Sequence, residues 1–311
     1  MPIFNARIAV RIRSCTGFGL ISNRIWDANL SQNLTYTWTP QTYSVFTMTW
    51  IPGEGSENMT IQLTEGSRSV QRNGLQYETR PIETNFEYGN WGGSYQVIGF
   101  MAERYFAGYT ENSNFVNDDI SVISDGQLSK ILIDSDDRKS LYTGSSLILE
   151  EGYSLNIVEV DVNGNTVWVQ LEKDGGDVID NGFLSSNSNY VYETDLGGDA
   201  DDVPLIAVHL AQIFRGGTET NAIFVEGIFQ ISDEYVQIEN GGDRFGKMEI
   251  SSTSSSGIIM RNRDSFTLGR GDTVDIMGKL SFVVADSSEL RFAPIVEISE
   301  PGTYELRGNG S

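Results

Sequence analysis

The chain has 311 residues, with 43 acidic and 21 basic side chains and a net charge of −22. Such an acidic surface repels nucleic acids and anionic lipid headgroups, so neither is expected as a partner. One cysteine (Cys15) and one histidine (His209) exclude an intrachain disulfide and any metal site made of several thiolates or imidazoles. We therefore expect no cofactor and no dedicated metal site.

The first 24 residues differ from the rest in charge, because they contain four arginines and no acid. The arginines interrupt every apolar run, so this segment has no signal-peptide core, and it is left unassigned. Subtracting these four arginines from the net charge of −22 leaves −26 for residues 25–311. No apolar run approaches the roughly 20 residues that a membrane-spanning helix needs, and no membrane span is predicted in this chain.

From residue 36 onward the pattern is that of short strands. Apolar and polar residues alternate over a few positions at a time, and Gly, Asn, Asp and Pro separate these segments. This pattern is typical of all-β sandwiches or barrels, and it is clearest at 36–39, 44–50, 59–63, 154–160 and 166–171. Asn163-Gly164 between the last two segments predicts a hairpin turn whose two central residues both have positive φ.

Residues 86–109 form an aromatic run that is interrupted by glycines. Eight aromatic side chains fall within these 24 residues, a composition that favours pleated strands and tight turns over helices. The best helix candidate in the chain is one turn around residues 102–106.

Part of this run, WGGSYQVIGFMAERYFAGY at 91–109, resembles a hallmark of the S-layer duplication domain found in Methanosarcina-type methanogenic archaea, with one extra glycine after the tryptophan. Further blocks of the same family follow in the same order, and the resemblance covers roughly residues 30 to 307. These blocks are 128–136, 149–175, 203–209, 227–233, 246–249 and 277–287.

The resemblance implies a function. It predicts a non-catalytic structural protein of an archaeal surface layer, an acidic β-sandwich tile that assembles laterally into a porous sheet at the cell surface. The expected partners are further copies of itself or other S-layer subunits, and the expected modification is glycosylation. Main tile proteins of the family carry two copies of the domain, an acidic tether and a C-terminal membrane helix. One copy is present here, so a fragment, an accessory protein and a secreted relative are all open interpretations.

The sequence also suggests how the chain is divided. A weak internal echo between 149–157 and 268–276 indicates two linked β-sandwich domains. We expect one sandwich from residues 126–232 and a discontinuous one from 25–125 and 233–308. Simple tandem domains are the alternative.

A second class of function is an extracellular carbohydrate-binding or carbohydrate-active β-sandwich. It would use Trp38, Trp50 and Trp91 as platforms for sugar rings. The same tryptophans also suit strand positions in a core, and exposure of these rings would favour the sugar binder.

No catalytic residue is predicted. His209 lies in the apolar run 204–214, where a strand is expected, and no G-x-S-x-G nucleophile elbow accompanies it. The acidic residues are too numerous for any pair to be identified as the two carboxylates of a glycosidase.

Three acidic segments could be mistaken for calcium loops. Residues 161–172 begin with Asp and end with Glu, but the sixth position is Thr166 where an EF-hand loop needs glycine, so a hairpin is the better interpretation. For the loops at 134–137 and 195–202, two interpretations stay open: a solvated acidic surface, or oxygen ligands for a divalent cation.

Four sequons of the form Asn-x-Ser/Thr are candidate glycosylation sites. They begin at Asn29, Asn33, Asn58 and Asn309. Asn58 follows the polar, turn-like segment 52–57 and is the first choice.

Overall fold

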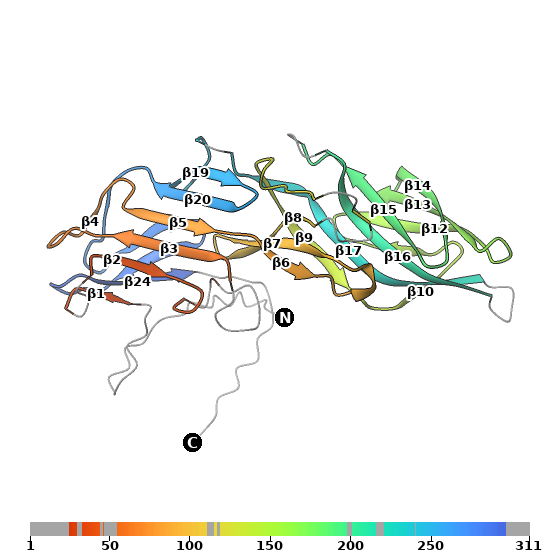
Figure 1. The fold of residues 1–311 in the computed structure, drawn as a ribbon, viewed down its shortest axis with the longest axis horizontal. Helices are drawn as coiled ribbons and strands as arrows, with labels where there is room; N and C mark the ends of the chain where they lie inside the picture. The colour runs from red at the N-terminus through yellow and green to blue at the C-terminus, as the bar shows by residue number, and fades with distance from the viewer. Residues whose placement is uncertain are drawn as a thin grey trace, which may run out of the picture.

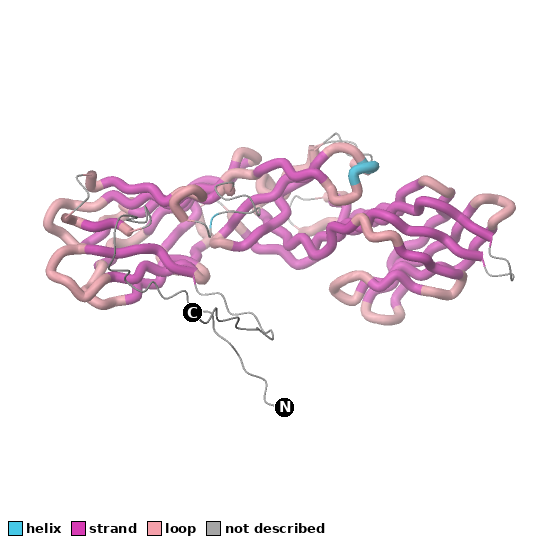
Figure 2. Tube along the Cα trace, turned by 90° about the horizontal axis from the view of Figure 1, so that it is seen from below, coloured by secondary structure: helices cyan, strands magenta, loops and turns pink. Residues whose placement is uncertain are grey.

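The computed structural model describes residues 25–29, 33–43, 46, 55–110, 115–116, 119–197, 201–215, 221–239 and 241–296. Within these ranges the chain is all-β, as predicted, and every strand pair is antiparallel. The one described helical element with defined bounds is a single 3-10 turn, η2 (Gly89–Trp91). Figures 1 and 2 show an elongated molecule in which sheets follow one another along the long axis.

The first hydrophobic core lies between two sheets, in the left half of Figure 1. One has six strands, in the order β18 (Arg244–Phe245), β19 (Met248–Ser254), β20 (Gly257–Asn262), β5 (Leu75–Thr79), β3 (Glu57–Gln62) and β2 (Thr35–Trp38). The other has four: β1 (Trp26–Asp27), β24 (Arg291–Val296), β23 (Leu280–Val284) and β22 (Thr273–Met277). β4 (Ser69–Val70) pairs with β21 (Phe266–Thr267) beside them.

Alternating side chains explain why these sheets pack together. In β5 and β3, every second residue is buried, and the residues between them are half-buried or exposed. The buried ring of Trp38 lies 5.4 Å from Phe282 and 5.8 Å from Phe292, so it joins the two sheets across the core. Such aromatic pairs add to the free energy gained from burying their area.

The second core lies in the right half of Figure 1, also between two sheets. The larger sheet has the order β15 (Ser188–Thr194), β16 (Val203–Arg215), β17 (Asn221–Gln237), β9 (Gln127–Ser135), β8 (Glu103–Tyr109), β7 (Ser94–Phe100) and β6 (Ile82–Asn85), and β10 (Lys139–Tyr142) pairs with β17. The smaller sheet is β11 (Ser146–Ile148), β12 (Tyr153–Asp161), β13 (Thr166–Lys173) and β14 (Asp177–Ser185).

The aromatic run joins the two cores. Its side chains on β7 and β8 divide between them: Tyr95, Val97, Phe106 and Tyr109 pack in the second core, and Ile98, Phe100, Tyr105 and Ala107 in the first. Both faces of this hairpin are therefore buried, which explains why its sequence is a nearly continuous apolar run rather than a clean alternation.

The helical turn expected at residues 102–106 is wrong. Residues 103–106 belong to β8, and Phe100 pairs with Glu103 across a two-residue turn at Met101 and Ala102, whose φ values are 55° and 65°. Two positive φ values define the tight hairpin turn that matches strand twist. This conformation is unusual for residues other than glycine, and contacts from another sheet hold it, as described below.

The hairpin at Asn163-Gly164 is confirmed, but its turn type differs from the prediction. Asp161 pairs with Thr166, and the loop has four residues instead of two. Asn165 has positive φ (51°), whereas Asn163 and Gly164 do not. The Asp161 carboxylate accepts the backbone N–H groups of Asn163 and Gly164, both at 3.0 Å, and this side-chain bonding favours the wider loop. The strand expected at 44–50 lies outside the described residues except for Phe46.

Candidate functional site

The buried acid Glu57 lies between the two halves of the molecule and has a raised pKa. It lies in β3, is 1% exposed, and its Oε1 accepts the Tyr77 hydroxyl at 2.7 Å and the Ala102 N–H at 2.9 Å. The Tyr77 oxygen in turn accepts the Met101 N–H at 3.1 Å. Burial raises the pKa of Glu57 to about 7, although these hydrogen bonds lower it.

Neighbouring hydroxyls complete this network. The Ser56 and Thr79 side chains lie 2.9 Å apart; Ser56 accepts the Gly99 N–H, and Thr79 donates to the Gly99 carbonyl. A Cβ on Gly99 would lie 2.6 Å from Glu57 Oε2, so only glycine leaves room for the acid. The network satisfies the polar groups of a strained turn. Its role is structural, because it holds two strands against a second sheet.

A second acid, Glu103, holds the same hairpin through two ion pairs. Glu103 Oε2 lies 2.5 Å from Lys130 Nζ of β9, and its Oε1 lies 2.6 Å from Lys279 Nζ in the turn between β22 and β23. Hydrogen bonds from these two lysines lower the pKa of Glu103 to about 2. The aromatic hairpin is thus tied beside its turn to β9 and to the turn between β22 and β23.

His209 lies in strand β16, as predicted. It is buried; its Nδ1 is 2.7 Å from Asn189 Oδ1, and its ring stacks on Tyr88 with centroids 4.9 Å apart. Burial lowers its pKa, so the ring is neutral at physiological pH. These contacts assign His209 to packing.

Two of the three tryptophans considered as sugar platforms are core residues. Trp38 is 0% exposed and Trp91 is 1% exposed; Trp50 lies outside the described residues. Among the described aromatic side chains, the exposed ones include Phe183 (72%), whose ring centroid lies 6.0 Å from that of Trp168 on β13. The carbohydrate-binding interpretation therefore loses the described residues that suggested it.

The acidic loops do not assemble into metal sites among the described residues. Asp134 turns inward, where its carboxylate accepts the Tyr95 hydroxyl at 2.8 Å and the Glu87 N–H at 3.0 Å, while Asp136 and Asp137 are exposed. Asp195 accepts the Asp202 N–H at 3.2 Å; residues 198–200 between them are not described.

The candidate glycosylation sites differ in their surroundings. Asn29 and Asn33 are exposed and flank the connection between β1 and β2. Asn58 is half-buried within β3, where it pairs with Glu78 of β5. Asn309 lies outside the described residues.

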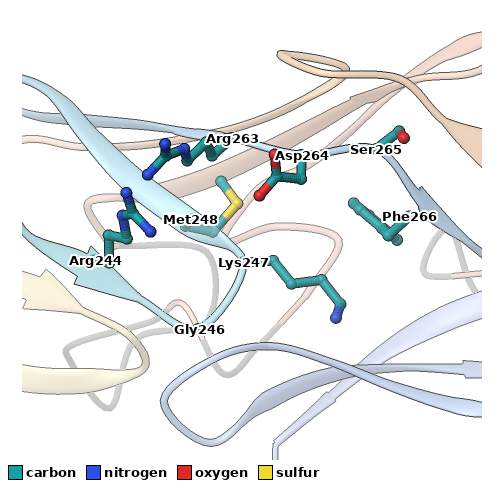
Figure 3. Close-up of a pocket in the computed structure, with 8 residues that line it drawn as sticks. All are labelled: Arg244, Gly246, Lys247, Met248, Arg263, Asp264, Ser265 and Phe266. Carbon is teal, nitrogen blue, oxygen red and sulfur yellow. The ribbon is translucent and has the colours of Figure 1, made fainter.

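The sequence analysis did not identify a pocket beside β18 and β19, which we call the basic pocket. It has a volume of about 190 Å³ and is lined by Arg244, Gly246, Lys247, Met248, Arg263, Asp264, Ser265 and Phe266. Figure 3 shows the arginine side chains extending toward one another near Met248, with Lys247 on the side of Phe266. Its basic residues come from different strands and turns, so no local motif marked it.

Among the described residues, no helix is long and apolar enough to cross a membrane. The geometry defines an acidic all-β protein of sandwich architecture, whose buried polar groups serve packing. The chain belongs to the S-layer protein family, which matches residues 27–286.

Three curated relatives carry the name Major S-layer protein. The chain is 33% identical over 264 residues to the one from Methanosarcina mazei, 35% over 257 residues to that of Methanosarcina acetivorans, and 32% over 265 residues to that of Methanosarcina barkeri. These alignments cover 81%, 79% and 82% of this chain, but 37%, 36% and 37% of the respective relatives. The chain therefore spans little more than a third of the length of these relatives.

Proposed function

We propose that this chain is a structural, non-catalytic subunit of an archaeal surface layer at the outside of the cell. It is an acidic β-sandwich tile that associates laterally with copies of itself or with other S-layer subunits in a porous sheet. The observation that carries the proposal is the family match, which extends over strands of both cores.

The proposal also divides the tile into two sandwich units. Residues 25–125 with 233–308, and residues 126–232, are the two sandwich units, and the aromatic hairpin at 94–109 packs against both cores. Because this hairpin has no free face, the two units would move as one body, which suits a load-bearing element of a sheet.

The charge of the tile sets the conditions for assembly. Neighbours with a net charge of −22 repel one another, and the screening length falls from about 30 Å at 0.01 M salt to about 8 Å at 0.15 M. Lateral association is therefore expected to strengthen with salt. Divalent cations at exposed acids such as Asp136 and Asp137 would strengthen it further.

Electron microscopy of the purified chain on a lipid support tests the proposal directly, with sheets expected at 0.15 M salt or above. Sedimentation across a salt series, with millimolar calcium or with chelator, measures the charge dependence. Absence of ordered sheets under all of these conditions contradicts the tile. Association that rises as salt is removed contradicts the role assigned to its charge.

A further inference from the structure

The basic pocket is an exception to the charge of the whole chain. Residues 241–280 hold six basic and five acidic side chains, in a chain with a net charge of −22. Basic groups gathered on an acidic protein attract the surface of another copy, because unlike charges steer association and fix its orientation.

The backbone around the pocket is held in place by buried contacts. Gly246 has φ +62°, and a Cβ there would lie 2.4 Å from the Ile276 carbonyl oxygen, which also accepts the Lys247 N–H at 2.8 Å. On the other side the fully buried Asn262 donates to the carbonyls of Gln71 at 2.8 Å and Asp264 at 2.9 Å. The arginines on either side of the pocket therefore project from a fixed frame.

The cations of the pocket are incompletely neutralised. Among the described residues, Arg244 and Lys247 have no ion pair, and Arg263 has one distant carboxylate, Glu249 Oε2 at 3.8 Å. The lining also includes one acid, Asp264. Two guanidinium groups directed toward one another repel, and a carboxylate between them would accept paired hydrogen bonds from their planar donors.

The small volume of the pocket restricts what can enter it. The turn between β13 and β14, residues 174–176, is exposed and contains two glycines, and the exposed Asp177 follows it as the first residue of β14. A Cβ on Gly175 or Gly176 would meet nothing within 4 Å, so this tip is slender. Lys173 at its base is paired with Asp233 and does not neutralise Asp177.

We propose that the basic pocket receives the 174–177 segment of a second copy of this chain, with Asp177 between Arg244 and Arg263; this rests on the proposed lateral assembly. Figure 1 shows β19 and β13 in opposite halves of the elongated molecule. The contact joins two different surfaces of the chain. A pair of copies therefore still has one unused 174–177 segment and one unused pocket, so the contact can be repeated in an open array.

Charge exchange tests this contact at 0.15 M salt, where long-range repulsion is largely screened. Arg244→Glu with Arg263→Glu should weaken self-association in sedimentation equilibrium by roughly tenfold or more. The matched control, Lys139→Glu with Arg215→Glu, changes the net charge equally at exposed sites elsewhere and should reproduce only the small loss due to net charge.

The partner segment is tested by restoring complementarity. Asp177→Arg alone should also weaken association, whereas a mixture of Asp177→Arg chains with Arg244→Glu/Arg263→Glu chains should associate more strongly than either alone. Circular dichroism checks that each variant is folded, and Arg244→Gln/Arg263→Gln replaces the double reversal if it is not.

Equal association of the pocket variant and its control, or no recovery in the mixture, overturns the proposal. A pocket variant that lowers the melting temperature of the monomer without weakening association also overturns it. The arginines would then stabilise the fold of the single chain and not the contact between copies. If wild-type sheets form while these pairwise measurements fail, the tile proposal stands and this contact does not. If the wild type never self-associates, both are wrong.

Discussion

The carboxylate of Glu57 supports the hairpin turn at Ala102 from a different sheet, by accepting the Ala102 N–H at 2.9 Å. The acid is 45 residues away in sequence, and it satisfies a donor of a turn whose two residues both have positive φ. A buried polar group that lacks such a partner costs about 1–3 kcal/mol. This contact links the conformation of the aromatic hairpin to the first core.

The first prediction concerns pH. The pKa of Glu57 is raised from 4.5 to about 7, so its protonated form is favoured in the folded state. Compared with its value at high pH, the unfolding free energy gains most from Glu57 below pH 4.5, where the acid is protonated. This gain decreases as the pH rises from 4.5 to 7, by about 3 kcal/mol in total. Glu57→Gln removes this titration, so the difference in unfolding free energy between variant and wild type should move in favour of the variant from pH 5 to pH 8. Denaturant titrations at both pH values measure it, and a constant difference would contradict the assignment.

A second prediction concerns the packing of the Tyr88 ring against Gly227. Gly227 has φ +71°, and a Cβ there would lie 2.5 Å from the Tyr88 ring. Gly227→Ala should therefore cost the strain of a left-handed alanine, about 1–2 kcal/mol, and in addition about 1–3 kcal/mol for displacing the ring. Gly66→Ala is the control, since Gly66 has φ +68° and nothing within 4 Å of its added Cβ. Equal melting temperatures for the two variants would show that the ring moves freely.

The third prediction separates packing from catalysis at His209. His209→Gln should lower stability by about 1 kcal/mol through the altered contact with Asn189 and leave sheet formation intact. Thermal unfolding and electron microscopy measure the two effects. Purified protein should not hydrolyse glycosides, esters or peptides above background. A turnover that disappears in this variant would reverse the assignment.

A fourth prediction concerns glycosylation. An N-glycan needs an accessible asparagine, so Asn29 or Asn33 should be modified in preference to Asn58, which is half-buried in a paired strand. Mass spectrometry of the protein from its native cell identifies the occupied sites, with Asn→Gln variants as controls. A glycan found at Asn58 alone would show that β3 is modified before it pairs.

The pattern of short, alternating segments predicted the all-β class, because the side-chain period of a strand appears directly in sequence. The strands around Asn163-Gly164 and the strand that contains His209 were predicted for the same reason. The family was also evident, because the motif of residues 91–109 recurs with further blocks in order. A single histidine and a single cysteine restricted the chemistry before any coordinates were considered.

Long-range contacts decided what the sequence could not show. The helical turn expected at 102–106 is a strand because Glu57 and Tyr77 satisfy the backbone of a distant turn. Similarly, Asp134 faces Tyr95 rather than the acids beside it in sequence, and Arg244 and Arg263 line one pocket only because β18, β19 and β20 pair. Local periodicity specifies which residues form strands, whereas side-chain partners tens of residues apart are set by how the sheets pack. The sequence alone therefore determined the class and family of this protein, and the tertiary structure determined which partners its acidic and basic side chains contact.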